Sequence, residues 1–149
     1  AYAPMDDGHA EGCLALARRW CDERCSPERP STFPETEAAC EAVLHRRELG
    51  LTGGVSLLDG EVAAFCLGEP LDGDTFVMHF EKSRPDMEGL AQAISRDFCA
   101  HAIPGYRYVN REQDLGDPGL RQAKEGSHPV YKVEKFRVRP LAGAPRGAA

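Results

Sequence analysis

Five polar side chains of different kinds occupy consecutive positions at residues 110–114, in the order Asn110, Arg111, Glu112, Gln113 and Asp114. They directly follow a short run rich in strand-favouring residues, at 106–109. A strand that ends in polar side chains and leads into a helix is where open α/β sheets usually hold their ligands. A solvated loop is the alternative interpretation. The dense polar run, with little room for small flexible residues, favours a functional site.

A second polar group lies within the β-like run at 74–82, where His79 and Glu81 are two residues apart. Alternation along a strand places both side chains on one face, within reach of Arg111 or Glu112. Transfer of an acyl group to an amine or hydroxyl needs a base for the nucleophile's proton and donors for the developing oxyanion. His79 suits the base near neutral pH. A structural histidine–glutamate hydrogen bond is the alternative.

Further charged residues surround these two groups and are expected to bind substrate or to form an ion network. Arg121 and Lys124 are three apart on a predicted short helix, so both can face one phosphate or carboxylate. We expect Glu112 or Asp114 to contact a basic neighbour directly and to lie largely out of water. The candidate catalytic residues are His79, Glu81 and Glu112, and the candidate substrate-binding residues are Lys82, Asn110, Arg111, Asp114, Arg121 and Lys124.

Composition indicates one soluble globular domain, because 149 residues with 42% hydrophobic and 28% charged side chains suffice for one core. The formal charge of −6 argues against general attraction to nucleic acid or anionic lipid, although basic residues crowd the last third of the chain. The sequence predicts no transmembrane segment and no signal peptide. We expect a cytoplasmic protein.

The six cysteines contain no C-x-x-C pair. Cys21, Cys25, Cys40 and His45 are the one set that can be read as zinc ligands, but structural zinc sites usually show tighter paired spacings. We therefore predict no metal site, mostly free thiols, and buried cysteines that behave as small hydrophobic side chains.

The elements that must position these residues follow from periodicity and turn signals. Helices are expected at 8–25, 35–49, 89–103 and 118–126, and strands at 52–58, 61–67, 74–82, 106–109 and 130–138. Prolines make 26–34 an exposed connector, and Asp59-Gly60 marks a hairpin. This order predicts a mixed α/β domain over 1–138, with a central, mostly antiparallel sheet flanked by helices. Residues 139–149 are expected to form a flexible tail.

The segments FVMHFEK (76–82), YVNREQDLG (108–116) and GLRQAK (119–124) resemble the GNAT acyltransferase superfamily. They are most similar to the C-terminal domain of phosphatidylglycerol lysyltransferases, over roughly residues 50–137. The resemblance implies a GNAT-like fold in which the strands at 74–82 and 106–109 splay apart around an acyl donor. It also implies aminoacyl-tRNA as donor, a lipid or small-molecule acceptor, a second GNAT-like domain as partner, and a peripheral position at the inner face of the membrane.

Two features depart from the pattern of the superfamily. The turn at 83–89 has one glycine, a proline without an N–H donor and two acidic residues, which argues against acyl-coenzyme A as cofactor. The segment at 125–127 is also less basic and aromatic than expected. The leading hypothesis is an acyltransferase of the aminoacyl-transfer type. The alternative is a non-catalytic GNAT-like half-domain that binds a ligand or partner.

Overall fold

The structure is a computed structural model that describes residues 1–24 and 32–139, in two compact units, 1–113 and 114–149. The elements of the first unit are β1 (Tyr2–Pro4), a 3-10 turn (Asp7–His9), α1 (Ala10–Arg24), α2 (Thr32–Leu44), β2 (Thr52–Leu58), β3 (Glu61–Pro70), β4 (Thr75–Ser83), α3 (Leu90–His101) and β5 (Tyr108–Asn110). The second unit contains α4 (Pro118–Glu125). The predicted connector at 26–34 lies largely outside the described residues.

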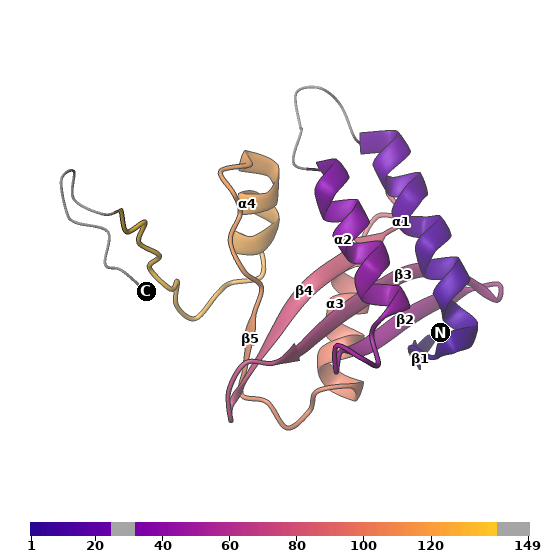
Figure 1. Ribbon diagram of the computed structural model, residues 1–149, viewed down its shortest axis with the longest axis horizontal. Coiled ribbons are helices and arrows are strands. Elements are labelled where there is room, and N and C mark those ends of the chain that lie inside the picture. Colours follow the sequence, from indigo (N-terminus) through magenta and orange to yellow (C-terminus); the bar gives the residue numbers. More distant parts are fainter. Residues whose placement is uncertain (25–31, 140–149) are drawn as a thin grey trace, which may run out of the picture. The chain divides into compact units, whose positions relative to one another are not determined.

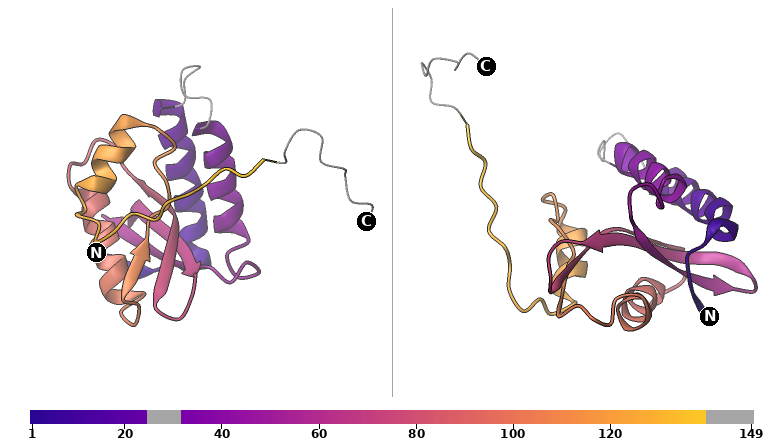
Figure 2. Two further views of the ribbon diagram at one scale, coloured as in Figure 1. Left: turned by 90° about the vertical axis from the view of Figure 1, so that its left-hand side faces the viewer. Right: turned by 60° about the horizontal axis from the view of Figure 1, so that its bottom comes forward.

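One five-stranded sheet organises the first unit, in the order β1-β2-β3-β4-β5. The first three pairings are antiparallel and the last, between β4 and β5, is parallel. Helices α1 and α2 cover one face of this sheet and α3 covers the other (Figures 1 and 2). The predicted mixed α/β fold with a mostly antiparallel sheet is confirmed. Strand β1, which pairs with β2, was not predicted.

Each face of the sheet has its own hydrophobic core. The core beneath α1 and α2 includes Leu16, Val43 and Phe65, and the core beneath α3 includes Phe76 and Phe98. The apolar face of α3 is formed by Ile94 and Phe98, which are both fully buried. Strand β3 supplies side chains to both cores, as its near-continuous burial requires.

A β-bulge in β4 interrupts its alternation at His79. Phe80 pairs with Leu67 of β3 and Met78 pairs with the next residue, Gly68, so His79 is an extra residue between them. Phe76, Met78 and Phe80 therefore do not share one face, as regular alternation would require. Phe76 and Met78 lie in the α3 core, whereas Phe80 packs against the α1/α2 core. Gly68 is required here, because a Cβ would collide with the Val77 carbonyl.

The strand predicted at 130–138 is absent, since these residues belong to no helix or strand of the structure. No residue between 114 and 139 is buried, so this stretch lacks the packed neighbours that would stabilise a strand. The tail beyond residue 139 lies outside the described residues.

The cysteines largely follow the prediction. Cys13, Cys40, Cys66 and Cys99 are free, and Cys13 and Cys66 are fully buried. Burial raises the pKa of the Cys13 thiol to about 12, which keeps it protonated and unreactive. Cys21 departs from the prediction, because it is disulfide-bonded.

Candidate functional site

Strands β4 and β5 pair over only three residues each, so β4 continues alone along this edge. The pairing joins Thr75 to Tyr108 and ends where Val77 faces Asn110. In the described part of the chain, the residues from Met78 to Ser83 have no partner strand on that side. This divergence agrees with the predicted splayed pair of strands.

His79, the bulge residue, lies at the start of the unpaired stretch and is held by two carboxylates. Its Nδ1 is 2.8 Å from Glu112 Oε1, and its Nε2 is 3.0 Å from Glu69 Oε1. The His79 side chain is 27% exposed, against 45% for Glu69 and 38% for Glu112. The ring is thus partly shielded, while both carboxylates stay open to water.

The pKa of His79 is raised above its ordinary value by these two neighbours. Partial burial acts in the opposite direction, because it penalises the imidazolium. The hydrogen bonds and negative charges of Glu112 and Glu69 together outweigh that desolvation. The site therefore favours a protonated ring that donates to both carboxylates.

Asn110 and Glu112 form a tight turn that returns the chain toward His79. The Glu112 backbone N–H donates to the Asn110 side-chain oxygen at 2.8 Å. Glu112 also has a φ of 56°, in the left-handed region that few side chains adopt. This bond and the strained turn place the Glu112 carboxylate beside the His79 ring.

Glu81 and Arg111 form the second ion pair, with Arg111 Nη2 2.9 Å from Glu81 Oε2. Their side chains are 18% and 29% exposed. Glu81 pairs in register with Cys66, in the α3 core, so it faces the side of the sheet opposite to Phe80. The predicted reach of His79 and Glu81 to Glu112 and Arg111 is confirmed. The prediction that His79 and Glu81 share a face is wrong, because the bulge breaks the alternation.

Lys82 is enclosed between β4 and the helices α1 and α2. Only 2% of its surface is exposed, its Nζ is 2.7 Å from Glu35 Oε1, and it lies 3.6 Å from the centroid of the Trp20 ring. An ammonium held by a carboxylate and an aromatic face is well compensated for burial. A substrate-binding role, expected from the sequence, would require access that this environment does not give.

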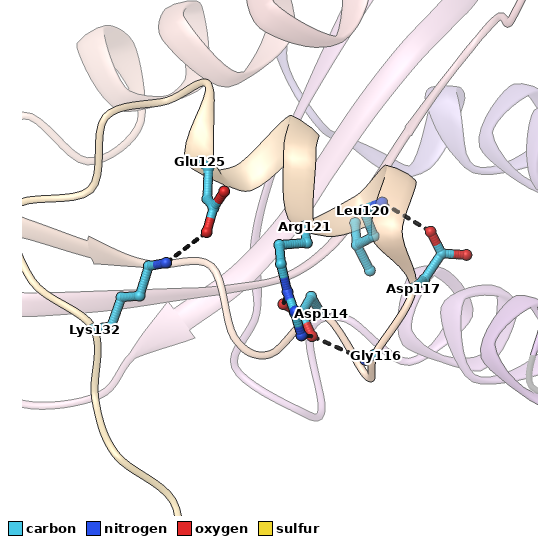
Figure 3. A network of polar contacts seen from close by, with 7 residues as sticks. All are labelled: Asp114, Gly116, Asp117, Leu120, Arg121, Glu125 and Lys132. Atoms are coloured by element: carbon cyan, nitrogen blue, oxygen red, sulfur yellow. Dashed lines mark hydrogen bonds and ion pairs between the residues drawn. The ribbon is translucent and has the colours of Figure 1, made fainter.

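The second unit holds Asp114, Arg121 and Lys124, the last two on α4. Figure 3 shows the contacts of Asp114 and Arg121. Arg121 Nε is 2.6 Å from Asp114 Oδ2, and this hydrogen bond lowers the pKa of Asp114 to about 2. The predicted contact is confirmed. The predicted burial is only partial, because the side chains of Asp114 and Glu112 are 26% and 38% exposed. Asp117 caps α4 by accepting from the Leu120 N–H, and Lys132 pairs with Glu125.

Sequence reasoning missed Glu69, the second carboxylate at His79. Its position in the hairpin of β3 and β4 could have indicated it. Glu69 pairs with Val77 of β4, one position beyond the Gly68–Met78 pair that borders the bulge. Within residues 1–24 and 32–139, no group of three potential ligand side chains is arranged to hold a metal ion. Across the same residues, none of the helices combines the length and hydrophobicity needed to span a bilayer.

The sequence from 1 to 139 matches the family described as phosphatidylglycerol lysyltransferase, C-terminal. The chain is also similar to the solved structure of a conserved protein of unknown function from Bacteroides thetaiotaomicron VPI-5482. That similarity has 34% identity and a TM-score of 0.81, over 88% of this chain and 44% of the Bacteroides chain. This chain therefore spans less than half the length of that protein.

More distant structures share the fold. A ribosomal-protein-alanine N-acetyltransferase from Brucella melitensis biovar Abortus 2308 has 15% identity and a TM-score of 0.63, over 93% of this chain and 97% of that chain. An aminoglycoside N-acetyltransferase in complex with coenzyme A has 13% identity and a TM-score of 0.61, over 94% and 95%. No curated protein matches the chain. With its fold and its family match taken together, the chain belongs to the phosphatidylglycerol lysyltransferase C-terminal family, on a GNAT acyltransferase-like fold.

Proposed function

We propose that this domain transfers an aminoacyl group from charged tRNA to a lipid or small-molecule acceptor. The family and the fold support acyl transfer in general. The observation that carries the finer proposal is His79, held between Glu69 and Glu112 where β4 leaves β5. A histidine bracketed by carboxylates at a strand divergence has both the means to move a proton and room for a substrate.

In this proposal His79 and its two carboxylates act together as the base. The acceptor's hydroxyl or amine displaces Glu112, through which the Nδ1 proton of the ring is lost to water. The neutral ring then accepts a hydrogen bond from the acceptor at Nδ1, while Glu69 accepts from the Nε2–H. His79 takes the acceptor's proton as the acceptor attacks the aminoacyl ester carbon, and the resulting imidazolium is stabilised by Glu69. When the ester C–O bond breaks, the same proton passes to the departing ribose oxygen.

Arg111 supplies positive charge to the proposed site. Its guanidinium is oriented by Glu81 at 2.9 Å, and it is 29% exposed, so it is fixed yet within reach of solvent. A fixed cation beside a developing oxyanion lowers the energy of the tetrahedral intermediate. Asn110 supports the site by accepting a hydrogen bond from the Glu112 backbone N–H, which holds the turn at Glu112.

The turn after β4 supports aminoacyl-tRNA rather than acyl-coenzyme A as donor. Arg84 in this turn is already engaged by Asp86 through contacts of 2.7 and 3.1 Å, and its pKa is raised by that pair. A pyrophosphate at this turn would meet the negative charges of Asp86 and Glu88, and Pro85 offers it no N–H donor. Arg121 and Lys124 remain proposed phosphate contacts in the second unit, where tRNA offers a larger anionic surface.

The proposal is tested by incubating the full chain with phosphatidylglycerol vesicles and tRNA charged with radiolabelled lysine. The quantity measured is the rate at which labelled lysine appears in the lipid. We expect His79→Gln to reduce transfer by about 100-fold or more, the usual loss on removal of a general base. His45→Gln is the matched control, because His45 also lies beside two glutamates, at 2.6 and 3.5 Å, but is 51% exposed after α2. Equal rates for the two variants would refute the assignment.

A non-catalytic half-domain is the second candidate, and one observation favours it: both ring nitrogens of His79 already bond to carboxylates. A second GNAT-like domain would then supply the chemistry. The match covers only 44% of the Bacteroides relative, so the rest of a chain of that length is a candidate for such a domain. If the chain binds lysyl-tRNA or phosphatidylglycerol but transfers nothing until joined to such a domain, this candidate replaces the first.

A further inference from the structure

The segment that follows β5 reaches the His79 ring through one side chain, that of Glu112. β5 ends at Asn110, which is still paired with β4, and the next residue, Arg111, is held at 2.9 Å by Glu81. Glu112 comes directly after this anchor, and its Oε1 is 2.8 Å from His79 Nδ1. The chain is thus fixed to the sheet up to residue 111, and Glu112 is the first residue beyond the fixed part.

The backbone at Glu112 is strained. Its φ of 56° lies in the left-handed region, which is costly for a residue with a side chain. Two contacts oppose this strain: the Glu112 N–H donates to the Asn110 side chain at 2.8 Å, and the carboxylate meets His79. Loss of the contact with His79 therefore favours relaxation of the turn. Relaxation unpacks no core beyond it, because no residue from 114 to 139 is buried.

The two carboxylates at the ring are not equivalent. Glu69 pairs in register with Val77 in the hairpin of β3 and β4, and its φ is not positive. When the imidazolium loses one proton, the unstrained Glu69 can keep the Nε2–H, at 3.0 Å. The lone pair left on Nδ1 then faces the lone pairs of the Glu112 carboxylate, and two acceptors repel each other. The strained carboxylate is the one that this repulsion releases.

The charge of the ring is controlled by these same groups. Among the described residues, the charged side chains that contact His79 are Glu69 from β3 and Glu112 after β5, whereas α1 and α3, which also pack against β4, bring none. On β4 itself, Glu81 is paired with Arg111. Partial burial lowers the pKa of His79, but the two glutamates outweigh it, so the pKa lies above the ordinary value of 6.5.

We propose that Glu112 is a latch on the His79 ring, closed while the ring is protonated and released when the ring loses its Nδ1 proton to water. In the closed state the carboxylate occupies the nitrogen that a hydroxyl or amine of a substrate would use. In the open state Nδ1 presents a free lone pair, and the turn at Glu112 relaxes. The control of access to a catalytic base rests on the proposed function. The movement of the latch does not, and it is measured without substrate.

Nuclear magnetic resonance of the full chain tests the latch, from pH values below 6.5 to values well above the raised pKa of His79. The experiment follows the protonation of the His79 ring and the hydrogen-exchange protection of the Glu112 amide, corrected for the intrinsic effect of pH on exchange. We expect this protection to fall with the same midpoint as the ring titration. Because the coupling is reciprocal, the fall should be about tenfold for each pH unit by which Glu112→Gln lowers the pKa of His79.

Three variants separate the latch from a general effect of pH. In Glu112→Gln the protection should not depend on pH, because the amide can accept from a protonated ring and donate to a neutral one. His79→Gln should abolish the dependence as well. Glu69→Gln is the matched control: it also removes one carboxylate from the ring but leaves the latch, so protection should still fall, with a lower midpoint.

Three results would overturn the proposal. The first is protection of the Glu112 amide that stays constant in the parent while the ring titrates. The second is an unchanged pH dependence in His79→Gln, because another group would then control the turn. The third is a dependence that is lost in Glu69→Gln and kept in Glu112→Gln, which would make Glu69 the mobile carboxylate. Absence of acyl transfer would leave each of these measurements in force, so failure of the latch and failure of the proposed function are separate results.

Discussion

At the scale of single residues, His79 is governed by a competition between partial burial and two carboxylates. Burial alone would lower its pKa, and Glu112 and Glu69 reverse that effect. The folded protein therefore binds this proton more tightly than the unfolded chain does. Proton binding at His79 is coupled to folding, whatever the site does chemically.

This coupling predicts that His79 stabilises the fold most at acidic pH. Its contribution is fully present below the ordinary histidine pKa of 6.5 and is lost as the pH rises through the raised folded-state value. Relative to His79→Gln, the parent should lose unfolding free energy over that interval. Urea unfolding at several pH values measures it. A difference that grows with pH would contradict the assigned sign.

Sequence reasoning at this scale found the partners but not their geometry. The pairs His79–Glu112 and Glu81–Arg111 were within the predicted contacts, because the strand order placed the two polar groups side by side. The face of the sheet on which His79 and Glu81 each lie could not be predicted in the same way. Alternation presumes a regular strand, and a bulge leaves no reliable mark in the composition of one chain.

At the scale of elements, Lys82 joins β4 to both covering helices. Its ammonium is shared between Glu35, at the start of α2, and the face of Trp20 on α1. Glu35 is 50% exposed, whereas the Lys82 side chain is 1% exposed. The burial cost therefore falls on the lysine, and Glu35 is the partner that offsets it.

Glu35→Ala should consequently destabilise the first unit by about 1–3 kcal/mol, less than the loss for a fully buried pair because the Trp20 ring remains. Adding Lys82→Met should recover most of that loss, since a methionine of similar length needs no counter-charge. Glu37→Ala, on the exposed side of the same helix, controls for the change in helix propensity. Chemical denaturation of the parent and these three variants would refute the account if Glu35→Ala and Glu37→Ala behaved alike.

The helices and the β2–β3 hairpin could be predicted at this scale, whereas two strand assignments failed. β1 is three residues long and acquires its strand geometry from pairing with β2, so local pattern gave no signal. At residues 130–138 the error is the reverse: the residues favour a strand, but they belong to no strand of the structure. Strands depend on partners, and a sequence alone does not say where the partner is.

At the scale of the whole molecule, the two units differ in how they are stabilised. The first has two hydrophobic cores on a shared sheet. The second has none, because no residue from 114 to 139 is buried and α4 relies on its cap and on exposed ion pairs. Such pairs contribute little to stability.

Removal of residues 114–149 should therefore leave the first unit folded. We expect the thermal midpoint of the shortened chain, measured by circular dichroism, to differ from that of the full chain by less than about 4 °C. The far-ultraviolet spectrum should keep both helical and strand signals. A shortened chain that fails to fold would show that stability extends across the boundary at residue 113.

The bulge in β4 has a consequence for how this site can be inherited. Every other residue of β4 near His79 already faces its partner in β3, since Met78 and Phe80 oppose neighbouring positions of that strand. Loss of the single His79 codon would leave a regular strand with both cores intact, and the proposed base would vanish. The free energy of unfolding of the deletion variant should thus lie within about 1.5 kcal/mol of the parent's value. The same variant should transfer no aminoacyl group. A collapsed fold would disprove this, whereas a stable one would mean that a lineage can shed the reaction and keep the domain in one genetic step.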